Sequence, residues 1–249
     1  MRTVIASILI VSVIAGSRTA GAQARHAGLE QMPASLETRF ALSALPPSMR
    51  KGATVYRLDV EHGYEIAQQG ASGIACLVQR TAWEQADFRD DIYVPRCYDA
   101  AGSRSYLHVL LDAAELRAAG TKPQELKAEI EARYKNGRYT IPDRAGLSYM
   151  EAPLMRTWGP DGVTVSTVSG PHLMFYAPNV TAADIGASAD GSKSLPFVVQ
   201  EGVAEQTFII QLTGETERRT IVATERKLLD DLCAYRNVLC LRRRALDRS

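Results

Sequence analysis

Residues 112–137 read DAAELRAAGTKPQELKAEIEARYKNG, and this stretch decides the fold class. Its apolar residues recur at helical spacing on both sides of Gly120, which predicts one helix at 112–119 and a second at 121–137. Segments with β character lie before and after this helical pair, without a regular βαβ alternation. The sequence therefore predicts an α+β domain with an antiparallel meander sheet and a central helical pair.

The predicted strands are short and are separated by glycine, proline and polar residues. Three of them, which we expect to form a meander, precede the helical pair at 54–60, 64–68 and 74–78. A fourth is predicted at 106–111, directly before the first helix. Five more follow the pair, at 147–150, 163–168, 173–176, 197–200 and 207–212.

The first 22 residues have the pattern of a secretory signal peptide. Met1-Arg2 is followed by an uncharged run at 3–16, and residues 19–22 read TAGA, an Ala-x-Ala cleavage site before Gln23. The run is shorter than the roughly twenty residues that a membrane-spanning helix needs. We therefore expect cleavage after Ala22 and export of a soluble protein to the periplasm or the extracellular medium.

Composition divides the rest of the chain into three parts. Residues 23–34 are predicted to be a flexible arm, 35–213 the α+β domain and 214–249 a charged C-terminal helical appendage.

The chain has 29 Lys and Arg against 28 Asp and Glu, and two of the arginines belong to the signal peptide, which leaves 27 against 28. This near-neutral balance argues against a nucleic-acid partner. No other uncharged run approaches the length of a membrane span, so none is expected after cleavage.

Export would place the cysteines in an oxidising compartment, where disulfides form. Cys76 lies in an apolar run, and Cys97 follows a polar connection. A disulfide between them would join two strands across a loop of about twenty residues and contribute about 3 kcal/mol. The alternative is that both are buried thiols that pack as small hydrophobic side chains.

The pairing of Cys233 with Cys240 depends on the C-terminal helix. An amphipathic helix is predicted at 225–241 from the spacing of Leu228, Leu232, Tyr235 and Leu239. On an unbroken helix the two cysteines would be about 10.5 Å apart along the axis, which is beyond disulfide reach. Their pairing is therefore left open, and Asn237 is the expected break point if it occurs.

Residues 169–179, SGPHLMFYAPN, hold the densest group of candidate functional side chains. In an extended conformation His172 and Tyr176 share one face. The candidate catalytic group is His172 as a general base, with Tyr176 or Asp184 in support and Asp184 or Glu201 orienting the imidazole. No nucleophile is identifiable nearby, and the alternative is a core strand with polar ends.

Motifs for cofactors and metals are missing from the sequence. It contains neither a phosphate-binding loop nor a G-x-G-x-x-G fingerprint, so no nucleotide cofactor is predicted. The histidines are scattered; His108 and His172 are candidates for a shared metal, but two hydrogen-bonded core histidines fit the pattern better, and no metal is predicted. Ser48 and Lys51 have the S-x-x-K spacing without its companion motifs, which we attribute to chance.

Four segments, ALSALPP at 41–47, GATVY at 52–56, CLVQR at 76–80 and HLMFYAP at 172–178, resemble a group of uncharacterised exported bacterial proteins. The order of these segments and the helical pair are similar too, over roughly residues 36–212. The resemblance implies a location in the bacterial envelope and no particular activity. It does not extend to the segment that carries Cys233 and Cys240.

These patterns favour a non-enzymatic binding or envelope-associated module, whose partner is an unknown small molecule or envelope component. The alternative is a small secreted hydrolase or isomerase that uses His172 as a general base. The apolar face of the C-terminal helix is expected to pack either on the domain or on a second copy of the chain. The second case would give self-association.

Overall fold

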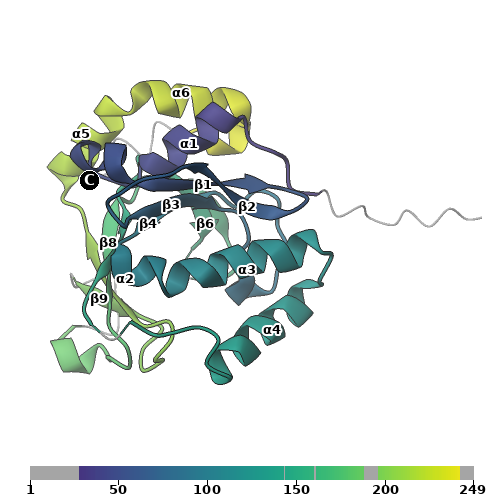
Figure 1. The fold of residues 1–249 in the computed structure, drawn as a ribbon. Helices are drawn as coiled ribbons and strands as arrows, with labels where there is room; N and C mark the ends of the chain where they lie inside the picture. Colours follow the sequence, from purple (N-terminus) through teal and green to yellow (C-terminus); the bar gives the residue numbers. More distant parts are fainter. Residues whose placement is uncertain (1–27, 143, 160, 188–195, 242–249) are drawn as a thin grey trace, which may run out of the picture.

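The computed structural model describes residues 28–142, 144–159, 161–187 and 196–241. The predicted signal peptide at 1–22 lies outside these ranges, as do residues 242–249. The main sheet has eight strands in the order β2-β1-β3-β4-β5-β8-β10-β9, and β6 and β7 form a separate hairpin (Figure 1). The α+β class predicted from the sequence is therefore confirmed.

The elements follow in chain order. The strands are β1 (Thr54–Asp59), β2 (Gly63–Gln68), β3 (Ala75–Gln79), β4 (Val94–Tyr98), β5 (Leu147–Met150), β6 (Met155–Trp158), β7 (Val165–Val168), β8 (His172–Tyr176), β9 (Phe197–Val199) and β10 (Phe208–Leu212). The α-helices are α1 (Ala34–Leu42), α2 (Ala100–Ser103), α3 (Tyr106–Ala118), α4 (Pro123–Lys135), α5 (Glu215–Thr224) and α6 (Arg226–Tyr235). The 3-10 turns are η1 (Pro47–Gly52), η2 (Trp83–Gln85), η3 (Ala183–Ile185) and η4 (Asn237–Leu239).

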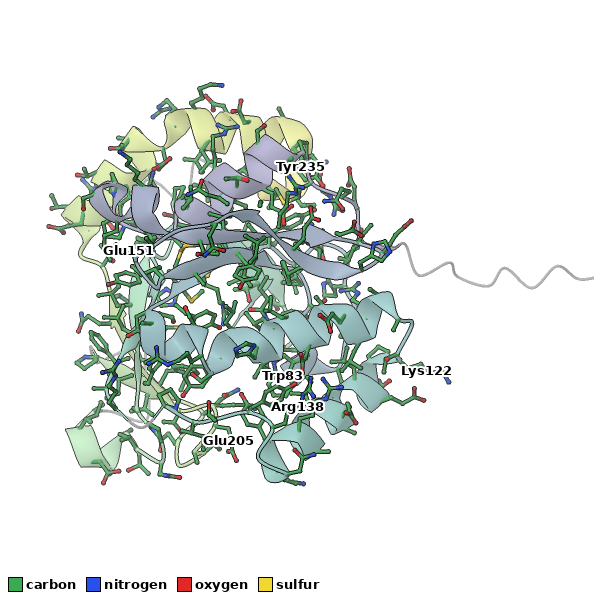
Figure 2. All side chains as sticks on the ribbon, viewed as in Figure 1. Trp83, Lys122, Arg138, Glu151, Glu205 and Tyr235 are labelled. Carbon is green, nitrogen blue, oxygen red and sulfur yellow. A yellow bond between two sulfur atoms is a disulfide. The ribbon has the colours of Figure 1, made fainter. Side chains whose placement is uncertain are left out.

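Helices cover the β1–β4 half of the sheet on both faces. α1 and α6 lie on one face, and α3 and α4 lie on the other (Figure 1). Tyr235 accompanies α6, whereas Trp83 lies on the α3 side (Figure 2). Strand β3 is buried along its whole length, and its alternate residues enter two different cores: Cys76 packs with α1 and α6, and Leu77 packs with α3 and α4. This alternation is what a pleated strand between two helical layers requires.

The first three strands do not form the predicted meander. β1 pairs with β2 in antiparallel fashion, but its other neighbour is β3, which runs parallel to it from Thr54 opposite Ala75. β1 therefore lies between the other two strands, whereas a meander would place β2 in the middle. The connection at 69–74 has to carry the chain from β2 across to the other side of β1. The alternation of apolar and polar residues within a single strand does not predict this path.

The strand predicted at 106–111 is wrong, because these residues form the first part of α3. The buried residues of α3 are Tyr106, Leu107, Val109, Leu110, Ala113 and Ala114. This spacing is helical. It continues without interruption from 106–111, predicted as a strand, into 112–118, predicted as a helix. The apolar run at 106–111 is too short for its spacing to distinguish a helix from a strand.

The second helix of the central pair begins later than predicted. Lys122 precedes the first turn and Pro123 occupies it. The Gln124 side chain donates a hydrogen bond to the carbonyl of Ala86. Leu126 and Ile130 are fully buried, as the helical spacing predicts.

The Cys76–Cys97 disulfide is confirmed. The two residues lie directly opposite each other on the antiparallel strands β3 and β4, with Cα atoms 4.0 Å apart. Both are completely buried in the core that α1 and α6 share with the sheet. The bridge therefore lies at the centre of the packed structure.

The C-terminal helix breaks, and Cys233 pairs with Cys240. The helix α6 ends at Tyr235, and Arg236 has an extended conformation with φ −143° and ψ 126°. This break is one residue before the predicted position. Leu228, Leu232 and Leu239 all pack in the same core as Cys76. The apolar face of α6 is thus covered by its own chain, and the self-association predicted through that face gains no support.

We expect the Cys233→Ser, Cys240→Ser double variant to lose about 2 kcal/mol of unfolding free energy, since the bridge closes a short loop. The fold should persist, because Leu228 and Leu239 keep the two sides of the break packed. Urea unfolding of both proteins, followed by circular dichroism, measures the difference. A loss below about 0.5 kcal/mol would show that packing alone fixes the break.

Residues 28–33 differ from the predicted flexible arm. The Gln31 side chain donates to the carbonyl of Leu58 at 2.5 Å and accepts from the backbone N–H of Val60 at 3.2 Å. Met32 is 2 % exposed and belongs to the core. This part of the segment is therefore bound to the end of β1.

Candidate functional site

His172 lies at the start of β8 and is 7 % exposed. Its Nδ1 is 2.8 Å from the carbonyl oxygen of Gly170, so Nδ1 carries a proton and donates to that oxygen. Burial lowers the pKa of His172, which keeps the imidazole neutral. The imidazole of His172 is thus buried and hydrogen-bonded to the backbone, and this arrangement gives no support to the hypothesis that His172 is a general base.

Tyr176 is four residues further along β8, and its hydroxyl has separate partners. It lies 2.8 Å from the carbonyl oxygen of Leu147 and 3.2 Å from Oδ1 of Asp99. A Cβ at Gly102 would lie 2.0 Å from this hydroxyl oxygen, so the close packing requires glycine there. Burial, together with Asp99, raises the pKa of Tyr176. This hydroxyl joins α2, β5 and β8 and acts as a structural group.

The remaining candidates are dispersed. Asp184 is exposed in η3, where its Oδ2 accepts hydrogen bonds from the backbone and hydroxyl of Thr181, each at 2.8 Å. Glu201 is exposed in the turn after β9, and His108 is exposed on α3 while His172 is buried. Ser48 and Lys51 are exposed in η1. Each candidate thus has its own surroundings, and the structure does not assemble His172, Tyr176 and Asp184 into a group.

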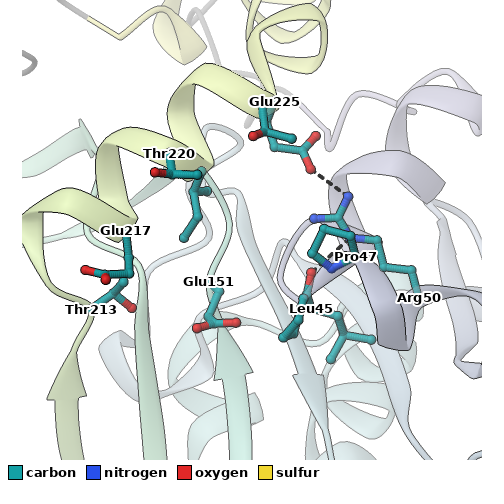
Figure 3. A pocket seen from close by; sticks show the side chains of 11 residues that line it. Leu45, Pro47, Arg50, Glu151, Thr213, Glu217, Thr220 and Glu225 are labelled. Carbon is teal, nitrogen blue, oxygen red and sulfur yellow. Dashed lines mark hydrogen bonds and ion pairs between the residues drawn. The ribbon is translucent and has the colours of Figure 1, made fainter.

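A different site is formed where η1 approaches α5. A cleft of about 390 Å³ lies between three parts of the chain: residues 45–50, which follow α1; Glu151, which follows β5; and the helix α5 (Figure 3). It is lined by Leu45, Pro46, Pro47, Arg50, Glu151, Thr213, Glu217, Thr220, Ile221, Thr224 and Glu225. α1 ends at Leu42, and Pro46 and Pro47 then lead the chain into η1, whose turn forms one wall of the cleft. The opposite wall is the face of α5 that carries Glu217, Thr220, Ile221 and Thr224, at helical spacing.

Arg50 is the single cation among the described residues that line this cleft, and it is already paired. Arg50 donates through Nε to the carbonyl of Leu45 at 2.9 Å and through Nη1 to Glu225 at 2.6 Å (Figure 3). The two remaining carboxyl groups, those of Glu151 and Glu217, are not balanced by a cation within the lining. Glu151 lies between the turn and α5, and burial raises its pKa although Arg50 acts against this. The cleft therefore combines apolar walls with excess negative charge.

A wider groove, of about 940 Å³, lies between residues 28–29, the end of β1 and the α3–α4 connection. Two cations, Arg117 and Lys122, line it, and the guanidinium of Arg117 donates to the carbonyls of Arg80, Phe88 and Arg89. Since these bonds hold the loop before β4, Arg117 has a structural role. The cleft at Glu151 is therefore the stronger candidate for ligand binding.

The sequence analysis did not find this site. Glu151 is a lone acidic residue after a predicted strand, and it meets residues 45–50 and 213–225 only in the folded chain. One local signal was available: the polar and apolar residues of α5 recur at the spacing of one helix face. That pattern indicates an amphipathic helix without indicating what its polar edge contacts.

No protein-family model, curated protein or solved structure matches this chain. Within the described ranges, every helix is too short or too polar to cross a bilayer. The same ranges bring together no group of three or more side chains suited to hold a metal. Function is therefore inferred from the geometry of the cleft.

Proposed function

We propose that this protein is an exported, non-enzymatic binding module whose ligand occupies the cleft between η1 and α5. The observation that carries the proposal is the combination of apolar walls and unbalanced carboxyl groups in a cleft of about 390 Å³. Pockets of roughly 300–1,000 Å³ typically hold small molecules. The signal-peptide pattern and the two disulfides support export, and the resemblance to exported bacterial proteins supports an envelope location.

The charge of the cleft selects the class of ligand. Arg50 is bound by Glu225, so it does not attract an anion. Glu151 and Glu217 remain to attract a positive group, while Leu45 and Ile221 offer apolar contact. The ligand is a small organic cation with an apolar body.

Proton linkage gives the proposal a pH signature. Burial favours the neutral form of Glu151 and raises its pKa. A bound cation favours the carboxylate, so binding below that pKa releases a proton. The affinity for the cation should therefore increase as the pH rises and level off once Glu151 is ionised in the free protein.

The test is isothermal titration calorimetry with phenethylamine and with the neutral 2-phenylethanol. We expect the amine to bind more tightly than the alcohol at pH 8. Glu151→Gln should weaken amine binding about tenfold, since a charge-assisted contact is lost and its neutral equivalent remains. The change should leave 2-phenylethanol unaffected.

Glu201→Gln is the matched control, because Glu201 is exposed and lies outside the cleft lining. Its amine affinity should equal that of the unaltered protein. Equal binding of amine and alcohol, or an unchanged affinity in Glu151→Gln, would refute the proposed ligand class.

A further inference from the structure

A second cavity, of about 220 Å³, adjoins the cleft at Glu151. It is lined by Arg39, Leu42, Arg50, Thr224, Glu225, Lys227 and Leu228. Arg50, Thr224 and Glu225 also line the cleft. The two spaces are therefore contiguous, and the ion pair between Arg50 and Glu225 lies at their border (Figure 3).

The second cavity carries more positive than negative charge. Its cations are Arg39, Arg50 and Lys227. Arg50 is neutralised by Glu225, whose Oε1 accepts from it at 2.6 Å. Arg39 and Lys227 share the carboxylate of Asp231, at 2.8 and 3.2 Å, and they lower its pKa, which keeps it ionised. Two cations thus share one carboxylate, and one positive charge is in excess.

The donors of this cavity are accessible to a ligand. The side chains of Lys227 and Arg39 are 84 % and 43 % exposed. Arg39 donates through Nη2 to Asp231 and through Nε to the carbonyl of Ser35, which leaves Nη1 without an acceptor among the described residues. The helix α6 begins at the same place, and its first turn contains no acidic residue after Glu225. The positive end of its dipole adds to the attraction of an anion.

Opposite charge preferences therefore lie a short distance apart. The cleft holds unbalanced carboxyl groups, and the second cavity holds the excess cation. Ile221 lines the cleft and Leu228 lines the second cavity, a step of two helical turns that corresponds to at most about 10 Å. A molecule that occupies both spaces needs a cationic group at one end and an anionic group at the other. The single excess positive charge suits a monoanion, and a carboxylate matches the donor geometry of a guanidinium.

We propose that the second cavity is the anion-binding half of the same site, and that the ligand is a small zwitterion with its cationic group at Glu151 and its carboxylate at Arg39 and Lys227. This inference rests on the proposed cation-binding function of the cleft and assigns the other end of the ligand. Arg50 and Glu225 lie beside the apolar chain and neutralise each other.

The test compares 8-aminooctanoate with 8-aminooctanamide by isothermal titration calorimetry at pH 8 and low ionic strength. The two molecules share the ammonium group and the chain, and only the first has a carboxylate. An extended chain advances about 1.2 Å per bond, so eight bonds cover about 10 Å. We expect the acid to bind about fivefold more tightly than the amide, as one exposed ionic contact allows.

Variants assign the preference to residues. The Arg39→Gln, Lys227→Gln double variant should bind the acid and the amide equally. Lys51→Gln is the matched control, because Lys51 is an exposed cation of η1 outside both linings, and it should keep the fivefold preference. Glu151→Gln should weaken both ligands alike, since it acts on the ammonium group that they share.

The outcomes separate this inference from the function on which it rests. Equal binding of acid and amide to the unaltered protein would overturn the zwitterion and leave cation binding intact. Binding of phenethylamine but of neither eight-carbon ligand would also overturn the inference alone. Failure of all three amines to bind would overturn the proposed function and the inference together. A preference that survives in the double variant would overturn the assignment to Arg39 and Lys227.

Discussion

Replacement of Leu232 by alanine should lower the free energy of unfolding by about 3–5 kcal/mol. Leu232 is 0 % exposed and lies in the core that also contains Phe40, Cys76 and Cys97. The change removes buried methyl groups from a closely packed region where α1, α6 and the sheet meet, and the cavity cannot collapse without moving one of these elements. Urea unfolding followed by tryptophan fluorescence measures the loss.

Asp230→Ala is the matched control, since Asp230 is exposed on the same helix. It should change stability by less than about 0.5 kcal/mol. A Leu232→Ala effect as small as this would mean that α6 is a separable appendage, as the composition of residues 214–249 suggests. A large effect would mean that the domain needs its C-terminal helices to complete its core.

Sequence reasoning succeeded where a local pattern determines the outcome. The strand at 173–176 and the buried face of α4 follow directly from their periodicity, and Cys76 was correctly paired with Cys97. It failed where the pattern is short or the outcome depends on distant residues. The run at 106–111 fits either period, and only its continuation into α3 shows it to be helical. The parallel pairing of β1 with β3 depends on the path of the loop at 69–74.

The sites illustrate the same division. His172 stood out because an imidazole is chemically versatile, but the residue that decides its role is Gly170, whose carbonyl fixes the ring. Glu151 belongs to no motif. It becomes notable because α5 packs near η1. Such features arise from tertiary packing, which local spacing does not encode.

Glu37 should make the protein less stable as the pH rises from about 4.5 to 7. Its side chain, on α1, is 1 % exposed; Oε1 accepts from the backbone N–H of Leu58 at 2.8 Å, and Oε2 is buried without a partner. Burial raises the pKa of Glu37 to about 7 from 4.5, although the Leu58 N–H and Arg80 act in the opposite direction. The folded protein therefore keeps a proton that the unfolded chain has already lost.

The sign follows from this difference in proton binding. Below pH 4.5 both states are protonated, so the contribution of Glu37 to stability is constant. Between 4.5 and about 7 the folded state binds more protons than the unfolded state, and stability falls with rising pH. Above about 7 both states are ionised and the loss is complete. A shift of this size corresponds to about 3 kcal/mol.

Glu37→Gln should remove this dependence, because glutamine retains an acceptor for the Leu58 N–H and does not titrate. The buried amide of glutamine lowers stability by the same amount at every pH. The informative quantity is therefore the change of unfolding free energy with pH, and not its absolute value. Urea unfolding at pH 4.5, 6 and 8 should show the variant gaining about 3 kcal/mol relative to the unaltered protein across this range. The exposed Glu61→Gln should leave the slope unchanged. Parallel curves for Glu37→Gln and the unaltered protein would show that Oε2 acquires a partner, such as a buried water, that stabilises the carboxylate.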